Sequence, residues 1–232
     1  MLKLRHINET TMAHLPSDFL DFFRELAQNN HKEWFDANRK RYESNVKKPF
    51  ENLVADVIER ARKYDPDLTL SAKDAIFRIN RDIRFSKDKT PYKLNRTAII
   101  SPYGRKDKTT PGFYLYVGPD KVMMGGGAYE VPTADLANLR NALQHNYDLF
   151  NSLITEPKFK KAFGAIQGEE HKRLPKELGI EADNGKPLLY KKQLFFMGEL
   201  PAATCERDDF SEIVEEHMKT AMPVISFLRE AI

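Results

Sequence analysis

The chain has 232 residues, 41% apolar and 31% charged, a composition typical of a soluble globular protein with a sizeable core. Its net charge of +3 is weak evidence for nucleic-acid binding, because a dedicated binder shows a larger excess on one face. The single Cys205 excludes an internal disulfide framework and fits a reducing cytosol, where we expect an inert buried thiol.

Neither a signal peptide nor a membrane span is predicted. Residues 1–16 have a basic start but no apolar run of sufficient length, and no other stretch approaches a span. We therefore expect a cytoplasmic protein with no membrane partner. Residues 1–16 are predicted to form a flexible lead-in, and residues 17–232 a single α+β domain.

Two helical patterns open this domain. Apolar residues recur at helical spacing over residues 19–26 and again over residues 31–64. Pro49 lies inside the second pattern and should break or kink it around residues 46–48. The aromatic side chains of both patterns are expected to belong to the core.

The stretch from Ala75 to Phe85 alternates between apolar and polar residues, which predicts a strand. One face of this strand is apolar apart from one arginine: Phe77, Ile79, Arg81, Ile83 and Phe85. The other face is polar: Arg78, Asn80, Asp82 and Arg84. A buried guanidinium needs a carboxylate or an anion. Arg81 is therefore expected either to pair with an acidic side chain of a covering helix or to face a ligand.

A hydrophilic loop follows this predicted strand and contains Lys87, Lys89 and Lys93. Residues 78–96 hold seven basic and two acidic residues, so the segment is more positive than the whole chain.

The next elements predict an antiparallel meander. Strands are expected at residues 96–101, 112–117 and 122–124, and the sequence GPDK between the last two indicates a hairpin. Short connections favour antiparallel pairing. The second strand, GFYLYV, is apolar on both faces, so we expect a central strand covered on both sides.

Gly125, Gly126 and Gly127 are predicted to end this hairpin, and they match neither a P-loop nor a dinucleotide fingerprint. Two interpretations are equally open. The glycines allow another backbone to approach closely, or their amides contact a ligand.

Helices and one strand complete the chain. Helices are predicted over residues 133–150 and 158–163, with a short helical piece at residues 169–174. A strand is expected at residues 194–197 and a final helix, kinked by Pro223, at residues 208–232. The fold class is therefore α+β, an antiparallel β-meander with N-terminal and C-terminal helices packed on the sheet.

No motif for catalysis or a cofactor is found. The six histidines show no metal-ligand spacing, and no nucleophile has an identifiable base, so no cofactor or metal is expected.

The motif RINRDIRFSKDKTPYK at residues 78–93, with NNHKEWF before it and GGG after it, resembles an uncharacterised bacterial family called domain of unknown function 2461. The resemblance extends over residues 17–232. It implies no activity, because members of the family have none assigned. The motif positions in this chain are Arg78, Arg81, Asp82, Arg84, Phe85, Lys89, Pro91, Tyr92, Lys93 and the glycines at 125–127.

Three functional hypotheses remain open. In the first, a small anionic ligand binds to Arg78, Arg81 and Arg84. Lys89, Tyr92 and Lys93 then form a loop over it, and Asp82 orients an arginine or acts as an acid or base. The glycines at 125–127 complete this site. In the second, the protein is a non-enzymatic structural or interaction protein, and the arginines tie helices to the sheet.

The third hypothesis is a nucleic-acid-binding module. Its phosphate contacts are basic side chains of two neighbouring segments: Lys87, Lys89, Lys93, Arg96, Arg105, Lys106 and Lys108. Tyr103 and Phe113 are its candidate stacking partners.

Overall fold

A four-stranded antiparallel sheet lies at the centre of the computed structural model, which describes residues 15–66, 68–174 and 185–232. Its strands lie side by side in chain order: β1 (Arg96–Ile100), β2 (Gly112–Val117), β3 (Lys121–Ala128) and β4 (Leu194–Pro201). The predicted hairpin joins β2 to β3, and the Gly118 N–H donates to the Lys121 carbonyl oxygen at 3.0 Å. The α+β meander is therefore confirmed.

Helices precede the sheet, interrupt it and follow it. The first group is α1 (Ser17–Gln28), α2 (Lys32–Ala37), α3 (Arg39–Arg41), η1 (Tyr42–Lys47), α4 (Lys48–Ala61) and α5 (Ala72–Ala75). Between β3 and β4 lie α6 (Thr133–His145), α7 (Tyr147–Thr155), α8 (Pro157–Phe163) and η5 (Pro187–Tyr190). The remaining elements are η2 (Gly104–Lys106), η6 (Ala202–Glu206) and α9 (Phe210–Glu230). None of the helices in the described ranges has the length and apolar character needed to cross a membrane.

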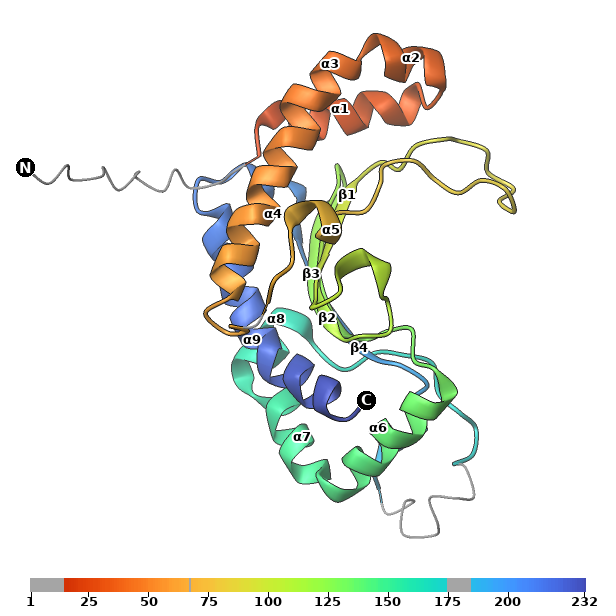
Figure 1. Ribbon diagram of the computed structural model, residues 1–232, viewed down its shortest axis with the longest axis vertical. Helices are drawn as coiled ribbons and strands as arrows, with labels where there is room; N and C mark the ends of the chain where they lie inside the picture. The colour runs from red at the N-terminus through yellow and green to blue at the C-terminus, as the bar shows by residue number, and fades with distance from the viewer. Residues whose placement is uncertain (1–14, 67, 175–184) are drawn as a thin grey trace, which may run out of the picture.

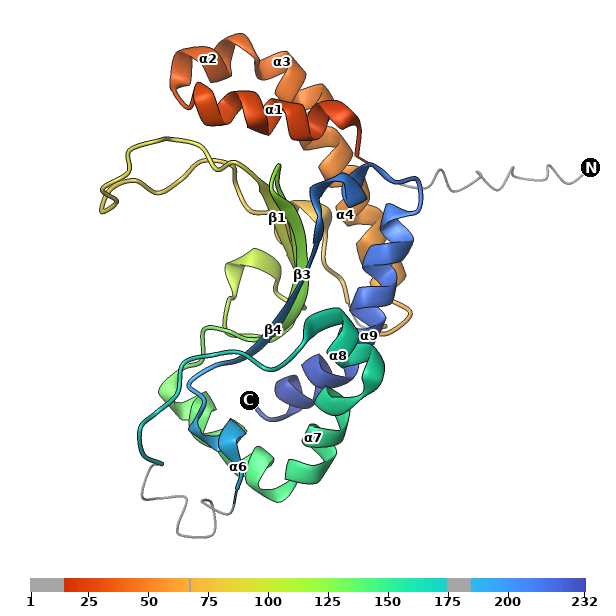
Figure 2. The same ribbon diagram turned by 180° about the vertical axis from the view of Figure 1, so that it is seen from behind.

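The two faces of the sheet have different surroundings. Helices α4 and α9 lie side by side over one face. Residues 78–93 and the connection through η2 lie on the other side (Figures 1 and 2). Leu115 and Phe196 point to the helical face and are fully buried, whereas Tyr114 and Tyr116 on the opposite face are only half-buried. GFYLYV is a central strand as expected, but its coverage is unequal: the helical face is fully buried and the other face only partly. We call the second face the open face.

Pro49 interrupts the long N-terminal helix as predicted. The chain forms a wider π-helical turn, η1, and continues as α4, with Pro49 in the first turn. Proline has no N–H to donate, so the regular hydrogen-bond pattern cannot pass through this position unchanged. Tyr42 and Val46 of η1 are both buried.

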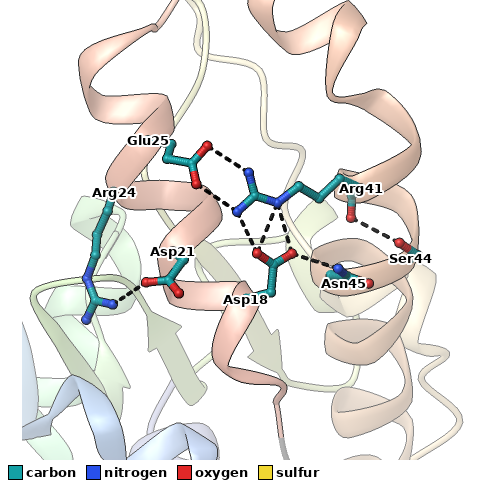
Figure 3. A network of polar contacts seen from close by, with 7 residues as sticks. All are labelled: Asp18, Asp21, Arg24, Glu25, Arg41, Ser44 and Asn45. Atoms are coloured by element: carbon teal, nitrogen blue, oxygen red, sulfur yellow. Dashed lines mark hydrogen bonds and ion pairs between the residues drawn. The ribbon is translucent and has the colours of Figure 1, made fainter.

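A polar network holds α1 against the start of this long helix (Figure 3). The Arg41 guanidinium binds the Asp18 carboxylate through Nε at 2.9 Å and the Glu25 carboxylate through Nη1 at 2.8 Å. The Asn45 amide also donates to Asp18, at 2.7 Å. The Arg41 hydrogen bonds and the Asn45 amide lower the pKa of the Asp18 carboxyl despite the opposing effect of its partial burial.

The predicted lead-in begins to pack before its expected end. Residues 1–14 lie outside the described part of the chain, but Leu15 is fully buried and its N–H donates to the Cys205 carbonyl oxygen at 3.0 Å. The ordered structure therefore starts at least two residues before residue 17.

Two predictions for the segment between β3 and β4 need correction. The helix expected over residues 133–150 is divided at Asn146 into α6 and α7. The helical piece expected at residues 169–174 is absent, because Gln167 and Glu170 form isolated bridges to Phe195 and Lys191 instead. Backbone hydrogen bonds to a distant segment have replaced the local ones that a helix would use.

The predictions for the end of the chain hold better. The short helix α8, the strand β4 and the long helix α9 all form where they were expected. Helix α9 continues through Pro223, and its last turns run in a different direction from its first turns (Figure 1).

The three consecutive glycines lie inside β3 and do not end the hairpin. Gly125 and Gly127 pair with Tyr114 and Gly112 of β2 on one side and with Met197 and Phe195 of β4 on the other. A Cβ atom on Gly125 would overlap the Phe196 carbonyl oxygen, and one on Gly127 would overlap the Leu194 carbonyl oxygen. This observation supports the interpretation that another backbone approaches closely.

We expect Gly125→Ala to lower the free energy of unfolding by about 3 kcal/mol, because its methyl group would force the β3 and β4 backbones apart. Gly164→Ala is the control, since Gly164 has φ +73° but no atom within 4 Å of an added Cβ. Its cost is the backbone conformation alone, with φ +73° and ψ −115°, about 1–2 kcal/mol. Urea denaturation of both variants measures the difference. A smaller loss for Gly125→Ala than for Gly164→Ala would contradict the close approach.

Candidate functional site

Residues 78–93 form an extended arm that leaves the body of the protein beside β1 and returns to it (Figure 1). Its two limbs hold each other, since the Arg81 N–H donates to the Pro91 carbonyl oxygen and the Lys93 N–H to the Ile79 carbonyl oxygen, both at 2.9 Å. The strand predicted from Ala75 to Phe85 is therefore wrong. The chain is extended, but only the isolated bridge from Ile76 to Ala98 joins it to the sheet.

The three predicted anion-binding arginines point to different partners. Arg81 donates to the Asp88 carboxylate at 2.5 Å and to Thr90, both in the arm itself. Arg84 pairs with Asp82 at 2.7 Å, and Arg78 is exposed. Among the described residues, no helix supplies a carboxylate to Arg81, whose side chain is 27% exposed. Up to Ile83 the alternation correctly separated the more buried side chains from the exposed ones, but the arm extends away from the body of the protein (Figure 1).

The far end of the arm carries an exposed phenylalanine. Phe85 is 95% exposed, so the predicted apolar face does not continue to this residue. The Lys89 ammonium donates to the Ile83 carbonyl oxygen at 2.8 Å and so ties the end loop together. Lys89 therefore has its hydrogen-bond partner within the arm, and so do Asp82, Arg81 and Arg84.

The base of the arm is fixed to the N-terminal helices through Tyr92. Its ring stacks on Phe35 with centroids 4.0 Å apart and planes 16° apart. The Asn30 side chain donates to the Tyr92 carbonyl oxygen at 2.9 Å and accepts from the Tyr92 N–H at 3.1 Å. Tyr92 is buried, so within this structure it anchors the arm to the body. Tyr92 therefore connects the segments NNHKEWF and TPYK of the motif in this chain.

Lys93 occupies a strongly positive environment at the base of the arm. Its ammonium lies 5.6 Å from the centre of the Phe77 ring, and it forms no hydrogen bond or ion pair with another described residue. Burial lowers the pKa of Lys93, and the positive charges of Arg96, Arg78 and Lys108 lower it further. A negative charge here would offset the repulsion among these cations.

A pocket of about 350 Å³ opens beside this cluster on the open face of the sheet. Aromatic rings form much of its wall: Phe77, Tyr114, Tyr129 and Phe195. Gly112, Gly126 and Gly127 contribute backbone, and Lys108 and Glu130 lie at its edge, 3.2 Å apart. Gly126 and Gly127 line this pocket, whereas Lys93 does not. The Phe77 ring, which also lines the pocket, lies 5.6 Å from the Lys93 ammonium.

Sequence reasoning missed most of this pocket. Tyr129 and Phe195 lie 5.1 Å apart between ring centroids, yet they come from opposite sides of the long segment between β3 and β4. No local pattern indicates that register. Tyr114 could have been found from the sequence. In GFYLYV the tyrosines alternate with apolar residues that are buried under the helices, so they lie on the opposite face of the sheet.

Arg96 is the most deeply buried arginine on the side of the sheet next to the helices. It is 5% exposed, and its guanidinium lies 5.6 Å from the centre of the Phe50 ring. Its Nε atom has no hydrogen-bond partner. Burial lowers the pKa of Arg96, while Tyr42, Glu51 and Glu43 oppose this change. Arg96 and the fully buried Phe113 are therefore inaccessible to the phosphate and base contacts predicted for them.

The described residues hold no group of three or more histidine, cysteine, aspartate or glutamate side chains that could bind a metal ion. Cys205 is fully buried, and burial raises the pKa of its thiol to about 12. The thiolate that nucleophilic chemistry needs is thus strongly disfavoured at neutral pH.

We expect Arg81→Ala to release the arm locally and to change the free energy of global unfolding by less than about 1 kcal/mol, because its partners lie within the arm. Tyr92→Ala should cost about 3 kcal/mol, because it removes a buried ring at the anchor. Urea denaturation measures the global effect, and hydrogen exchange of the arm amides measures the local one. Equal destabilisation by the two variants would show that Arg81 also holds the arm to the body.

The arm should loosen in acid through Asp88. Hydrogen bonds from the Thr90 amide and the Arg81 guanidinium hold the pKa of this carboxyl at about 2, below its ordinary value of 3.8. Because folding lowers the pKa of Asp88, its ionised carboxylate stabilises the folded arm. This stabilisation is fully present above pH 4 and is lost as the pH falls through 2. Carboxyl NMR should give a titration midpoint for Asp88 well below 3.8. A midpoint at 3.8 would exclude the ion pair in solution.

The comparisons with known proteins agree with the motif in the arm. Residues 18–227 match the family described as "Conserved hypothetical protein (DUF2461)". Neither the curated proteins nor the solved structures provide a significant match. Because the match extends over most of the sequence, the chain belongs to the DUF2461 family of conserved hypothetical proteins.

Proposed function

We propose that this protein binds a small organic anion, carrying a phosphate or carboxylate group, in the pocket on the open face of the sheet. Lys93 and Lys108 contact the anionic group, and Arg78 adds positive charge at the base of the arm. Gly126 and Gly127 contribute backbone to the same pocket. The proposal is limited to binding, because no described group supplies an identifiable nucleophile or base.

The observation that carries this proposal is the environment of Lys93. A half-buried ammonium without a counter-charge is unfavourable for folding, and nearby cations increase the penalty. Lys93 has three such neighbours in Arg96, Arg78 and Lys108, of which Lys108 itself pairs with Glu130 at 3.2 Å. Such an arrangement is retained at some expense in stability, which is typical of binding sites.

The distal part of the arm has a supporting role in this proposal. Arg81, Asp82, Arg84 and Lys89 hold the arm in its extended form through contacts with one another and with neighbouring arm residues. The arm thereby presents Lys93 and Arg78 in fixed positions. These contacts also favour the structural hypothesis for Arg81 and Arg84, with the arm itself as the element that they stabilise.

We place this binding in the cytoplasm, where the single buried Cys205 would stay reduced. The ligand is then a soluble cellular anion and not a membrane component.

Lys93→Met tests the proposal, because it keeps the apolar stem over Phe77 and removes the charge. Without ligand, this variant should be at least as stable as the parent protein, since a charge surrounded by like charges is gone. With phosphate or small carboxylates, it should bind about tenfold more weakly. Thermal melting and titration calorimetry measure the two effects.

Lys87→Met is the matched control, since Lys87 is an exposed lysine of the same arm. It should leave binding of small anions unchanged. If Lys93→Met destabilises the ligand-free protein and no anion raises the melting temperature of the parent, Lys93 is structural and the proposal fails. If both variants weaken binding of single-stranded nucleic acid in a salt-dependent manner, the polyanion hypothesis replaces it.

A further inference from the structure

We propose that the ligand of this pocket carries a single flat aromatic ring next to its anionic group, as an aryl or heteroaryl phosphate or carboxylate does. This inference rests on the proposed anion site and names the chemical class that it accepts. Three features of the pocket carry it: a floor without side chains, aromatic walls and a restricted volume.

The floor follows from the register of the sheet. Gly112 pairs with Gly127 across β2 and β3, so two neighbouring positions on two neighbouring strands have no side chain. The next residue of the same row, on β4, is Phe195. Strands lie about 4.8 Å apart, so these glycines bring peptide backbone to the pocket beside an aromatic ring. The space over Gly112 is narrow, because an added Cβ there would meet the Ile100 carbonyl oxygen at 2.9 Å. A flat ligand can approach this backbone more closely than a branched one.

The walls are aromatic on more than one side. Tyr129 meets Phe195 edge to face, with ring centroids 5.1 Å apart and planes 72° apart. Phe77 and Tyr114 belong to the same pocket. Tyr129 is 59% exposed, so its ring is available to a ligand without any rearrangement of the core. Aromatic pairs at such distances contribute free energy beyond the burial of their area.

The volume suits a small ligand. Ligand pockets commonly have volumes of about 300–1,000 Å³, and this one has about 350 Å³. A cavity of about 150 Å³ is known to hold benzene, so the pocket has room for one ring together with a charged substituent. The charged substituent lies at the edge near Lys108 and Phe77, where Lys93 is adjacent.

The experiment compares probes that separate the ring from the charge: inorganic phosphate, phenyl phosphate and phenol. Titration calorimetry with the full chain should show phenyl phosphate binding about tenfold more tightly than inorganic phosphate, and phenol more weakly than phenyl phosphate. Tyr129→Ala should remove most of the advantage of phenyl phosphate and leave inorganic phosphate unaffected. Because Tyr129 is exposed, this variant should fold normally.

Tyr103→Ala is the matched control, since Tyr103 is another exposed tyrosine, 64% exposed, outside this pocket. Tyr103→Ala should change neither the affinity for phenyl phosphate nor the affinity for inorganic phosphate. Equal affinities for phenyl phosphate and inorganic phosphate, or an equal effect of both tyrosine variants, would overturn the aromatic specificity and leave the anion site standing. If phenol binds as tightly as phenyl phosphate, or if no probe binds, the anion site itself fails, and the inference fails with it.

Discussion

The close approach of β3 and β4 at Gly125 and Gly127 is the constraint on which the rest of this structure depends. The two strands lie far apart in the sequence, and their pairing adds β4, from the C-terminal part of the chain, to the sheet. A side chain at either glycine would overlap a carbonyl oxygen of β4. Gly198 of β4 allows a similar close approach to helix α8, because an added Cβ there would overlap the Ala162 carbonyl oxygen. Only the short η6 and a few residues separate β4 from helix α9, so this pairing also helps to position the helix that covers the sheet.

The same glycines shape the open face, and a packing requirement therefore has a functional consequence. Glycine relieves the crowding between strands and at the same time leaves the pocket floor without side chains at Gly112 and Gly127. The structural and ligand-binding interpretations of the triple glycine are thus compatible. The steric requirement follows from the backbone geometry, whereas a ligand would use the space that this requirement creates.

The sequence predicted those features that depend on neighbouring residues. The GPDK turn, the interruption at Pro49 and the apolar face of α9 all follow from local chemistry. The Ala75–Phe85 strand was wrong because alternation indicates an extended chain but says nothing about a partner strand. Of the candidate site, Lys93, Gly126 and Gly127 were found through the motif. The Tyr129–Phe195 pair was not, because it depends on the register between β3 and β4, which no short pattern encodes.

The arm shows why a basic stretch of sequence does not by itself define a basic surface. Asp82 and Asp88 are the two acidic residues of the stretch, and they neutralise Arg84 and Arg81 near the far end of the arm. Four other cations of the arm form no ion pair with a described acidic residue: Lys87 and Lys89 near its far end, and Arg78 and Lys93 at its base. Of these, only Lys93 is half-buried, and Arg78, Arg96 and Lys108 lie near enough to lower its pKa further. Solvent and salt screen a partly buried charge less than an exposed one. For the ligand proposed above, the burial of Lys93 therefore matters more than the number of basic residues in the arm.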